Sequence, residues 1–304
     1  MTENVLAGKP VQLAGVPRRF WMLGICMAGV LGFLAVHALH PEWHLLPEAT
    51  SRYGPSTLLT IFLAAFICEY IDSSLGMGYG TTLTPMLVMF GFDPRAVVPC
   101  VLTSELITGL TATLMHHRDG NVDFVRDKNA RGTAILLSVL SVVGAVIAVQ
   151  LANKLSVPGL RLAIAVVILV TGIFTLATVR RQLRYRKSHI VTVGAIAAFN
   201  KGLSGGGYGP LVTAGQVVSG LSSKHAVAIT SLAESFTCLV AIIASLWLSK
   251  DLNWGLALPL AVGAVMSVPL ATMTVRWLPE KAMRASVGVM TVVLAIVMLT
   301  SGSR

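Results

Sequence analysis

The sequence predicts an all-α polytopic membrane protein with two inverted-topology repeats. Each repeat is a glycine-broken helical hairpin followed by three transmembrane helices, and an extra helix precedes the first repeat. Of the 304 residues, 55% are hydrophobic and only 12% are charged, whereas soluble domains carry about 25% charged residues. Most of the apolar residues fall in runs of about 20, the length that spans a bilayer as a helix. Two similar glycine-rich segments interrupt the remaining runs.

This composition excludes a soluble enzyme and a nucleic-acid-binding domain, because the chain has too few polar residues to cover a soluble core. The net charge of +10 comes from short basic clusters between apolar runs, which is typical of cytoplasmic loops. Cys26, Cys68, Cys100 and Cys238 lie in apolar stretches without Cys-x-x-Cys spacing. We interpret them as small core residues and predict no cofactor.

In chain order, residues 1–19 form an expected cytoplasmic N-terminus and residues 20–40 a first transmembrane helix. This helix is expected to be retained, because its apolar run exceeds the roughly 7–15 residues of a cleavable signal peptide. The first repeat covers residues 57–179, a basic cytoplasmic linker covers 180–189, and the second repeat covers 190–301. Unbroken spanning helices are predicted at residues 20–39, 97–115, 133–152, 160–179, 226–248, 254–277 and 282–300.

Two further apolar runs, residues 57–90 and 190–218, are broken by glycine. The interruptions are Gly76-Met77-Gly78-Tyr79-Gly80 and Gly205-Gly206-Gly207-Tyr208-Gly209. Each flank is about half to three-quarters of a spanning length, so we expect each run to form a helical hairpin. Short segments interrupted by glycine at matching positions of two halves typically mark the binding site of a transporter.

One sequence offset relates the two interruptions. The offset that places Gly76 on Gly205 also aligns the two tyrosines, and further along the chain it pairs Glu105 with Glu234. Glycine is common in membrane helices, but the paired tyrosine and glutamate are less easily matched by chance. We interpret the pattern as an internal duplication.

Charge counting sets the topology when the N-terminus is placed inside and each hairpin returns to its own side. The cytoplasmic basic residues are then Lys9, Arg18, Arg19, Arg118, Arg126, Lys128, Arg131, Arg180, Arg181, Arg184, Arg186, Lys187, Lys224, Arg276, Lys281 and Arg284. The outer ones are Arg52, Arg95, Lys154, Arg161, Lys250 and Arg304. This bias follows the positive-inside rule. Each half adds an odd number of crossings, so the second half is inverted. We expect a multi-pass protein of the cell inner (plasma) membrane.

The glycine runs are suited to bind an anion. They free backbone N–H groups from helical bonding, and a half-helix that begins after them presents orphaned N–H groups and a partial positive charge. An alternative is that the glycines only permit tight helix packing, which accounts less well for two equivalent motifs. The expected substrate-binding residues are Gly76, Gly78, Tyr79, Gly80, Thr81, Asn200, Lys201, Ser204, Gly205, Gly206, Gly207, Tyr208 and Gly209.

Charged residues within a membrane are costly and usually functional. Lys201 and Asp72 occupy equivalent positions, one turn before the two glycine runs. Lys201 either complements an anion or pairs with Asp72 as a structural tie, and the sequence leaves both roles open. We expect Glu69, Asp72, Glu105 and Glu234 to serve in coupling or gating, either by carrying protons or by binding helix ends.

Other clusters do not predict catalysis. His116, His117, Asp119 and Asp123 resemble a metal cluster, but they border a loop of mixed charge, so we interpret them as a solvated face and predict no metal site. A Gly-x-Ser-x-Gly elbow, a Walker-type loop and a His-Glu-x-x-His motif are absent from the sequence. We therefore predict no enzymatic activity.

The chain resembles the TauE/SafE family of sulfite exporters and sulfonate transporters over about residues 57 to 300. The motifs behind this are Gly76-Met77-Gly78-Tyr79-Gly80 with Pro85, Gly91-Phe92-Asp93-Pro94-Arg95-Ala96, Thr103-Ser104, Ser204-Gly205-Gly206-Gly207-Tyr208-Gly209-Pro210 and Thr230-Ser231. The resemblance implies an integral transporter of small sulfur-containing anions, such as sulfite, sulfoacetate or related organosulfonates, built from two similar halves. Met77 and Lys201 depart from the expected pattern and leave the substrate open.

We therefore expect a secondary transporter that exports such an anion by alternating access. The alternatives are a membrane-embedded enzyme acting on lipid phosphates and a passive anion channel. The expected partners are the anion and membrane lipids, with a homodimer open and no nucleic acid. Whether transport is uniport or coupled to protons or another ion also stays open.

Overall fold

The computed structural model describes residues 53–179, 187–218, 221, 223–249, 252–275 and 279–301, together with Gly29 and Gly32. The expected N-terminus and the expected helix at 20–40 lie outside the described residues, apart from those two glycines, which are helical. Most of the expected linker at 180–189 also lies outside them.

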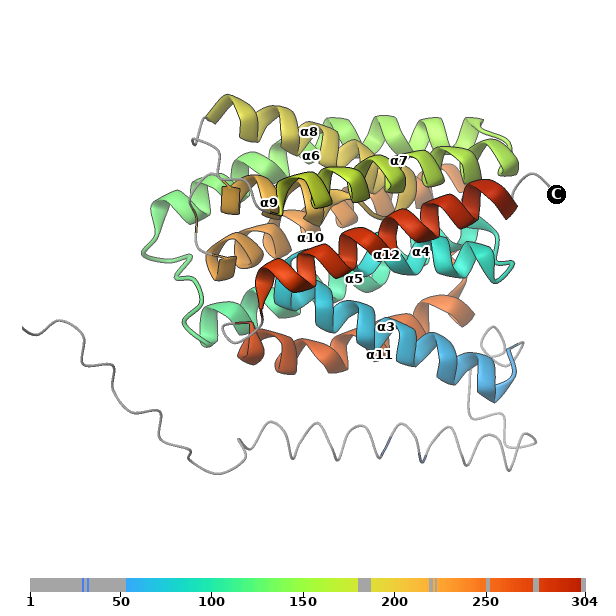
Figure 1. The fold of residues 1–304 in the computed structure, drawn as a ribbon, viewed down its shortest axis with the longest axis horizontal. Coiled ribbons are helices and arrows are strands. Elements are labelled where there is room, and N and C mark those ends of the chain that lie inside the picture. Colours follow the sequence, from blue (N-terminus) through green and yellow to red (C-terminus); the bar gives the residue numbers. More distant parts are fainter. Residues whose placement is uncertain are drawn as a thin grey trace, which may run out of the picture.

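The described part of the chain is a bundle of helices that run roughly along one direction (Figure 1). The helices of the first half are α3 (Pro55–Leu75), α4 (Tyr79–Met89), α5 (Pro94–Arg118), α6 (Lys128–Lys154) and α7 (Val157–Thr178). Those of the second half are α8 (Lys187–Ser204), α9 (Tyr208–Val218), α10 (Ser223–Ser249), α11 (Trp254–Thr274) and α12 (Glu280–Ser301). The all-helical class is confirmed, and both predicted interruptions fall between helices.

Side-chain caps start several helices before the predicted apolar runs begin. The carboxylate of Asp93 accepts a hydrogen bond from the Arg95 amide, and Pro94 occupies the first turn, so α5 begins at residue 94 rather than 97. The Asp127 carboxylate accepts from two first-turn amides of α6. A capping side chain satisfies the free amides at a helix start even when it lies outside the apolar run. Hydropathy detects only the apolar run, so it does not find the true start of the helix.

The hairpin arms are unequal in length. The first arms, α3 with 21 residues and α8 with 18, are longer than the expected half to three-quarters of a span. The second arms, α4 and α9, have 11 residues each. Among the described residues, α3 joins α5, α6, α7, α10 and α11 as helices long and apolar enough to cross a membrane. The glycine run in the first hairpin therefore follows an arm of nearly spanning length, and it does not divide the hairpin into two arms of equal length.

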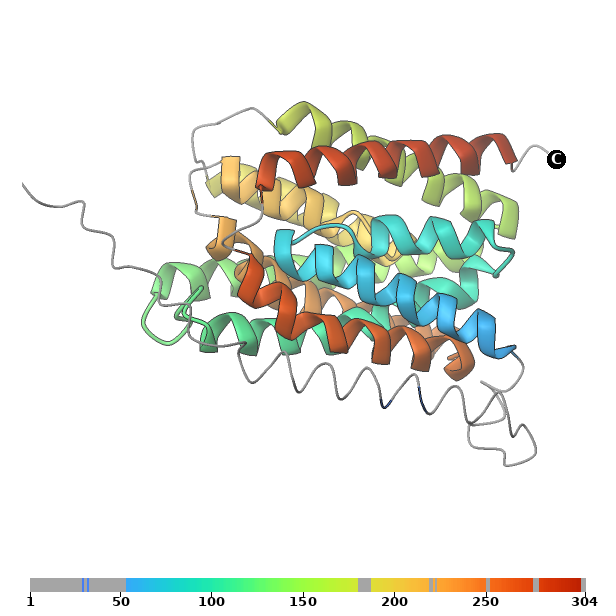
Figure 2. The same cartoon turned by 60° about the horizontal axis from the view of Figure 1, so that its bottom comes forward.

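Helix contacts in one half have counterparts in the other half. In chain order, α3, α5 and α6 of the first half are equivalent to α8, α10 and α11 of the second. α3 and α5 pack on α11, and their equivalents α8 and α10 pack on α6. The pairs α5–α10 and α7–α12 join equivalent helices of the two halves, and both pairs lie side by side in Figures 1 and 2. This exchange of partners is consistent with two halves related by a two-fold axis, as the inverted repeats predict.

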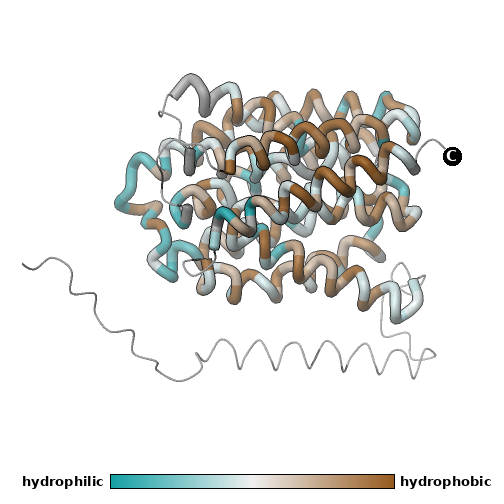
Figure 3. The backbone as a smooth tube through the Cα atoms, viewed as in Figure 1, coloured by the Kyte–Doolittle hydropathy of each residue, from teal (hydrophilic) through white to brown (hydrophobic). Residues whose placement is uncertain are grey.

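Large apolar side chains cover the outer faces of the bundle. Val139, Val143 and Ile147 on α6, and Val166 and Val170 on α7, are all exposed. Figure 3 shows apolar residues along the helices and hydrophilic residues gathered at one end, around the connection between α5 and α6. Such an apolar belt, which would be a liability in water, is what a lipid-facing surface requires.

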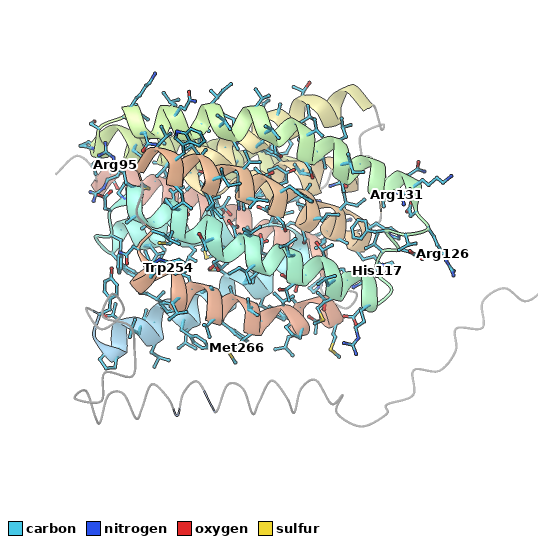
Figure 4. The ribbon with its side chains drawn as sticks, turned by 180° about the vertical axis from the view of Figure 1, so that it is seen from behind. Arg95, His117, Arg126, Arg131, Trp254 and Met266 are labelled. Carbon is cyan, nitrogen blue, oxygen red and sulfur yellow. The ribbon has the colours of Figure 1, made fainter. Side chains whose placement is uncertain are left out.

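Basic residues are separated between the two ends of the bundle. Figure 4 places Arg95 at one end with Trp254, and His117, Arg126 and Arg131 at the other. In the latter loop the Arg126 amide donates to the exposed Asp123 carboxylate, which lowers the pKa of that carboxyl. The predicted topology places Arg95 on the opposite side of the membrane from Arg126 and Arg131, which agrees with this arrangement. The orientation of the two ends relative to the cytoplasm stays a prediction.

Buried cysteines match the expectation for small core residues. Cys68, Cys100 and Cys238 are all buried and unpaired in disulfides. Cys26 lies outside the described residues.

Candidate functional site

The two glycine-rich interruptions form elbows that meet in the buried centre of the bundle. We call residues 76–80 the first elbow and residues 205–209 the second elbow. A Cβ added to Gly80 would lie 1.8 Å from the Gly205 carbonyl oxygen, and one added to Gly209 would lie 2.1 Å from that of Gly76. Only glycine permits backbones to approach this closely, so the expected role in close packing is present alongside any role in binding.

The contacts between the elbows are reciprocal. Gly76 and Gly205 both have φ of 69° and both end the first arm of a hairpin. The Thr213 hydroxyl donates to the Gly76 carbonyl at 2.9 Å, while its equivalent, Thr84, lies beside Gly205. The Thr84 hydroxyl is buried without a hydrogen-bond partner among the described residues. The elbows therefore share a geometry, but their polar groups differ.

The first elbow is already occupied by a carboxylate of the protein. The side chain of Asp72 accepts a hydrogen bond from the Tyr79 amide, at the start of α4, with a distance of 3.2 Å. Beside Gly78 lie the apolar side chains of Ile71 and Val287. The carboxylate complements the positive end of the helix dipole, so an anion at this position would compete with Asp72.

The second elbow has polar neighbours and no such carboxylate. A Cβ added to Gly207 would lie 3.2 Å from Asn200 Cβ and 3.2 Å from the Thr171 hydroxyl oxygen. Ser204 accepts a hydrogen bond from the Gly206 amide. No described residue accepts a hydrogen bond from the amides of residues 207–209 at the start of α9. These amides form the orphaned donor group that the sequence predicts.

A buried charge triad lies next to the second elbow. The Lys201 ammonium forms ion pairs with Glu105 and, at 2.7 Å, with Glu234. Lys201 is 1% exposed, Glu105 3% and Glu234 6%. The Lys201 carbonyl accepts from the Gly205 amide at 2.9 Å, which ties the triad to the elbow. The two glutamates are the equivalent pair that the sequence offset identifies.

Of the two roles that the sequence left open for Lys201, the pairing with Asp72 is not formed: the ion pairs of Lys201 within the described residues are with the two glutamates. Positions that are equivalent in two repeats lie across a two-fold axis, but a side chain pairs with whichever partner it reaches. The sequence offset identified Lys201 and Asp72 as equivalent, and that relation alone does not bring them into contact.

Glu69 lies buried without an ion pair among the described residues. Its two carboxylate oxygens accept hydrogen bonds from Ser73, at 2.6 Å, and from Thr108, at 3.1 Å. Ser73 lies one helical turn away on α3, whereas Thr108 comes from α5. These hydroxyls stabilise a buried carboxyl group without neutralising it.

Sequence reasoning missed several polar residues of the site. Thr171 beside the second elbow and Thr108 beside Glu69 come from helices whose apolar composition dominated the prediction. Tyr79, which was expected to bind substrate, directs its hydroxyl to Ser104 at 2.7 Å. The offset that aligns the two elbows also aligns Thr108 with Thr237, so the repeat itself contained a signal for Thr108.

The interpretation of His116 as part of a solvated face was wrong, because this side chain is fully buried. Its Nε2 lies 3.1 Å from the Ser73 carbonyl oxygen, and its Nδ1 lies 3.0 Å from the Asn121 side-chain nitrogen. The side-chain NH2 group of Asn121 can only donate, so Nδ1 accepts and Nε2 carries the proton that it donates to the Ser73 carbonyl. α5 continues past the predicted membrane boundary, which places His116 between helices rather than in the loop.

Comparisons with known proteins agree with this architecture. The model of the family described as Sulfite exporter TauE/SafE matches residues 61–298 of the chain. The probable membrane transporter protein YtnM of Bacillus subtilis (strain 168) is 27% identical over 233 residues, which are 74% of this chain and 75% of that protein. No solved structure matches the chain. With its apolar helices and paired elbows, the chain belongs to the sulfite exporter TauE/SafE family and is a multi-pass membrane transporter.

Proposed function

We propose that this transporter exports a small sulfur-containing anion, such as sulfite, sulfoacetate or a related organosulfonate, by alternating access. The family description supports the substrate class. The observation that carries the proposal is the second elbow, where orphaned amides at the start of α9 face polar side chains rather than a carboxylate of the protein. Orphaned helix amides bind the oxygens of an anion without a side-chain charge.

The difference between the elbows selects the binding position. At the first elbow an anion would have to displace Asp72 from the Tyr79 amide. At the second elbow Asn200 and Thr171 lie beside Gly207, and Lys201 lies one helical turn before Gly205 on α8. Asn200 has amide donors, and Lys201 supplies a positive charge when an anion draws it away from its glutamates. The anion therefore binds at the second elbow.

The close packing of the elbows supports alternating access. Tyr79 and Tyr208 are both fully buried, and the glycine backbones touch. An anion reaches the α9 amides only when the elbows separate toward one side of the membrane. Inverted halves suit this motion, since rocking one half against the other opens each side in turn.

The membrane potential favours export of such an anion. One charge that crosses 100 mV changes the free energy by about 2.3 kcal/mol, so a divalent anion that leaves a negative interior gains roughly 4.6 kcal/mol. A tenfold concentration ratio corresponds to about 1.4 kcal/mol. Without a coupled ion, this potential would sustain a gradient of more than about a thousandfold.

The test combines binding with transport. Purified protein is heated with sulfite, sulfate, sulfoacetate, taurine or acetate, and a ligand raises the unfolding temperature because it binds only the folded state. The Asn200→Ala variant is expected to lose most of the shift given by the best anion. Asn129→Ala, which removes an exposed amide on α6, serves as the matched control and keeps the shift.

Transport is then measured as efflux from proteoliposomes. Saturable efflux and anion counterflow are the expected results. Conductance without saturation would contradict the transporter and indicate a channel. Turnover of a phosphorylated lipid would indicate an enzyme instead. An unaltered thermal shift in Asn200→Ala would move the binding position away from the second elbow.

A further inference from the structure

The charge triad of Lys201, Glu105 and Glu234 contains two carboxylates for one ammonium group. All three side chains are more than nine-tenths buried. With every group ionised, the triad has a net charge of −1 at membrane depth. A buried charge without a partner is strongly unfavourable, because the surroundings cannot replace the lost hydration.

One carboxylate oxygen of the triad also lacks a donor. Glu105 directs Oε2 at Lys201, but Oε1 is buried and accepts no hydrogen bond from any described residue. Buried polar atoms in folded proteins nearly always have a partner. A proton on this carboxyl group would remove both the excess charge and the need for a donor at that oxygen.

The groups that face the triad do not supply a balancing cation. From α3, Glu69 and Asp72 add further carboxyl groups. From α10, Cys238 is buried beside Lys201 and carries no positive charge. The tyrosines at the starts of α4 and α9 are neutral. The buried Arg284 lies elsewhere, on α12 beside Thr178 of α7. Among these neighbours, the ammonium of Lys201 is the positive charge that the carboxyl groups share.

A metal ion is a poorer occupant than a proton. Within the described residues, no group of three or more His, Cys, Asp or Glu side chains is arranged to hold a metal ion. A hard cation requires about six oxygen ligands, and both glutamates already have an oxygen in contact with an ammonium group. A proton needs only one free oxygen.

We infer that the triad is a proton-binding site: Lys201 pairs with one glutamate while the other holds a proton, and the glutamate that Lys201 leaves takes up a second proton when the transported anion draws the lysine away. An O–H bond forms on that glutamate, and the proton comes from water on the side where the anion enters. On release of the anion, Lys201 returns to one glutamate, whose proton leaves to water on the opposite side. Anion and proton therefore move together. This inference rests on the proposed function.

The equivalence of the two glutamates explains why one lysine serves both sides. Glu105 and Glu234 occupy matching positions on α5 and α10, and each contacts the same ammonium group. When the halves rock, an inverted pair exchanges environments. Lys201 is thus always within reach of one of the glutamates, while the other holds the proton.

The first experiment measures proton movement in proteoliposomes of the full-length protein. Sulfoacetate is the probe, because its sulfonate stays ionised and does not cross the bilayer unaided. A pH dye reports the lumen, and potassium with valinomycin clamps the potential. Sulfoacetate efflux is expected to alkalinise the lumen. Glu105→Gln and Glu234→Gln are each expected to lower the pH change per sulfoacetate moved, a ratio that does not depend on the exchange rate of the variant. Asp123→Asn, at an exposed carboxylate, keeps the wild-type ratio.

The outcomes separate the two proposals. If sulfoacetate moves while the lumen pH of the wild type stays constant, or if its movement requires sodium instead, the inference is overturned and the exporter stands. If no anion of the panel moves, the exporter proposal fails, and the triad is tested alone by infrared spectroscopy. A protonated-carboxyl band that Glu105→Gln or Glu234→Gln removes is expected. Absence of such a band at every pH would overturn the proton site.

Discussion

Replacing Gly80 by alanine tests whether the elbows meet as described. The added Cβ would lie 1.8 Å from the Gly205 carbonyl oxygen, whereas ordinary Cβ contacts begin at 3.4 Å. Some part of the two elbows must therefore move by about 1.6 Å. The contacted atom belongs to the backbone and has no rotamer by which to escape. We expect the change to hold the elbows apart and to disturb both stability and transport.

The expected magnitude follows from two opposing effects. Alanine within a helix gains about 1 kcal/mol over glycine, while overpacking of a close-packed interior costs about 1–3 kcal/mol. Because the clash is with the backbone, we place the cost at the upper end. Gly80→Ala should lower the free energy of unfolding by about 1–2 kcal/mol.

The matched control is Gly132→Ala on α6, where an added Cβ meets nothing within 4 Å. This exposed helical position should gain about 0.5–1 kcal/mol from the same chemical change. Denaturant unfolding in micelles measures stability, and sulfoacetate exchange measures function. Gly209→Ala, at the reciprocal contact, should behave like Gly80→Ala. If Gly80→Ala is as stable as Gly132→Ala and exchanges at the wild-type rate, the elbows do not touch.

Two further predictions address the charges. Lys201→Met leaves the buried carboxylate that pairs with it without a counter-ion and should cost about 3–5 kcal/mol, measured by unfolding at neutral pH. The triple variant that adds Glu105→Gln and Glu234→Gln should recover most of this loss; equal stability of the two variants would contradict the ion pairs. For topology, single cysteines at Arg95 and Arg126 in a cysteine-free background should react with an impermeant maleimide from opposite sides, position 126 from the cytoplasm. Labelling of both from one side would refute the assigned crossings.

The sequence was sufficient to predict the helices and their interruptions, because both depend on local properties. Within the described residues, apolar runs of spanning length became helices, and two glycine runs became elbows with matching left-handed residues at Gly76 and Gly205. Helix ends were less well predicted. α6 begins at Lys128 rather than 133, because the polar residue Asp127 caps it outside the apolar run.

Side-chain partners were the part that the sequence did not determine. The offset between the repeats identified Glu105 and Glu234 as equivalent, but not that both would contact one lysine. His116 stands beside charged loop residues in the sequence, yet in the fold it is buried and faces the α3 carbonyl of Ser73. Such contacts depend on how helices rotate and cross, which apolar periodicity does not specify when helices are apolar on nearly every face.

The two halves differ in charge at the position that precedes each elbow. A strictly symmetrical pair of elbows would present two equal helix ends to an anion, and neither would be preferred. In this chain Asp72 fills the first helix end, while its equivalent, Lys201, stands beside the second. We propose that this difference closes the first site to anions and gives the second a cation. In the same proposal, Lys201 pairs with one of the two equivalent glutamates and leaves the other to bind a proton. Rocking of the two halves would then supply the alternating motion, and the difference between acid and base at one position would supply the selectivity.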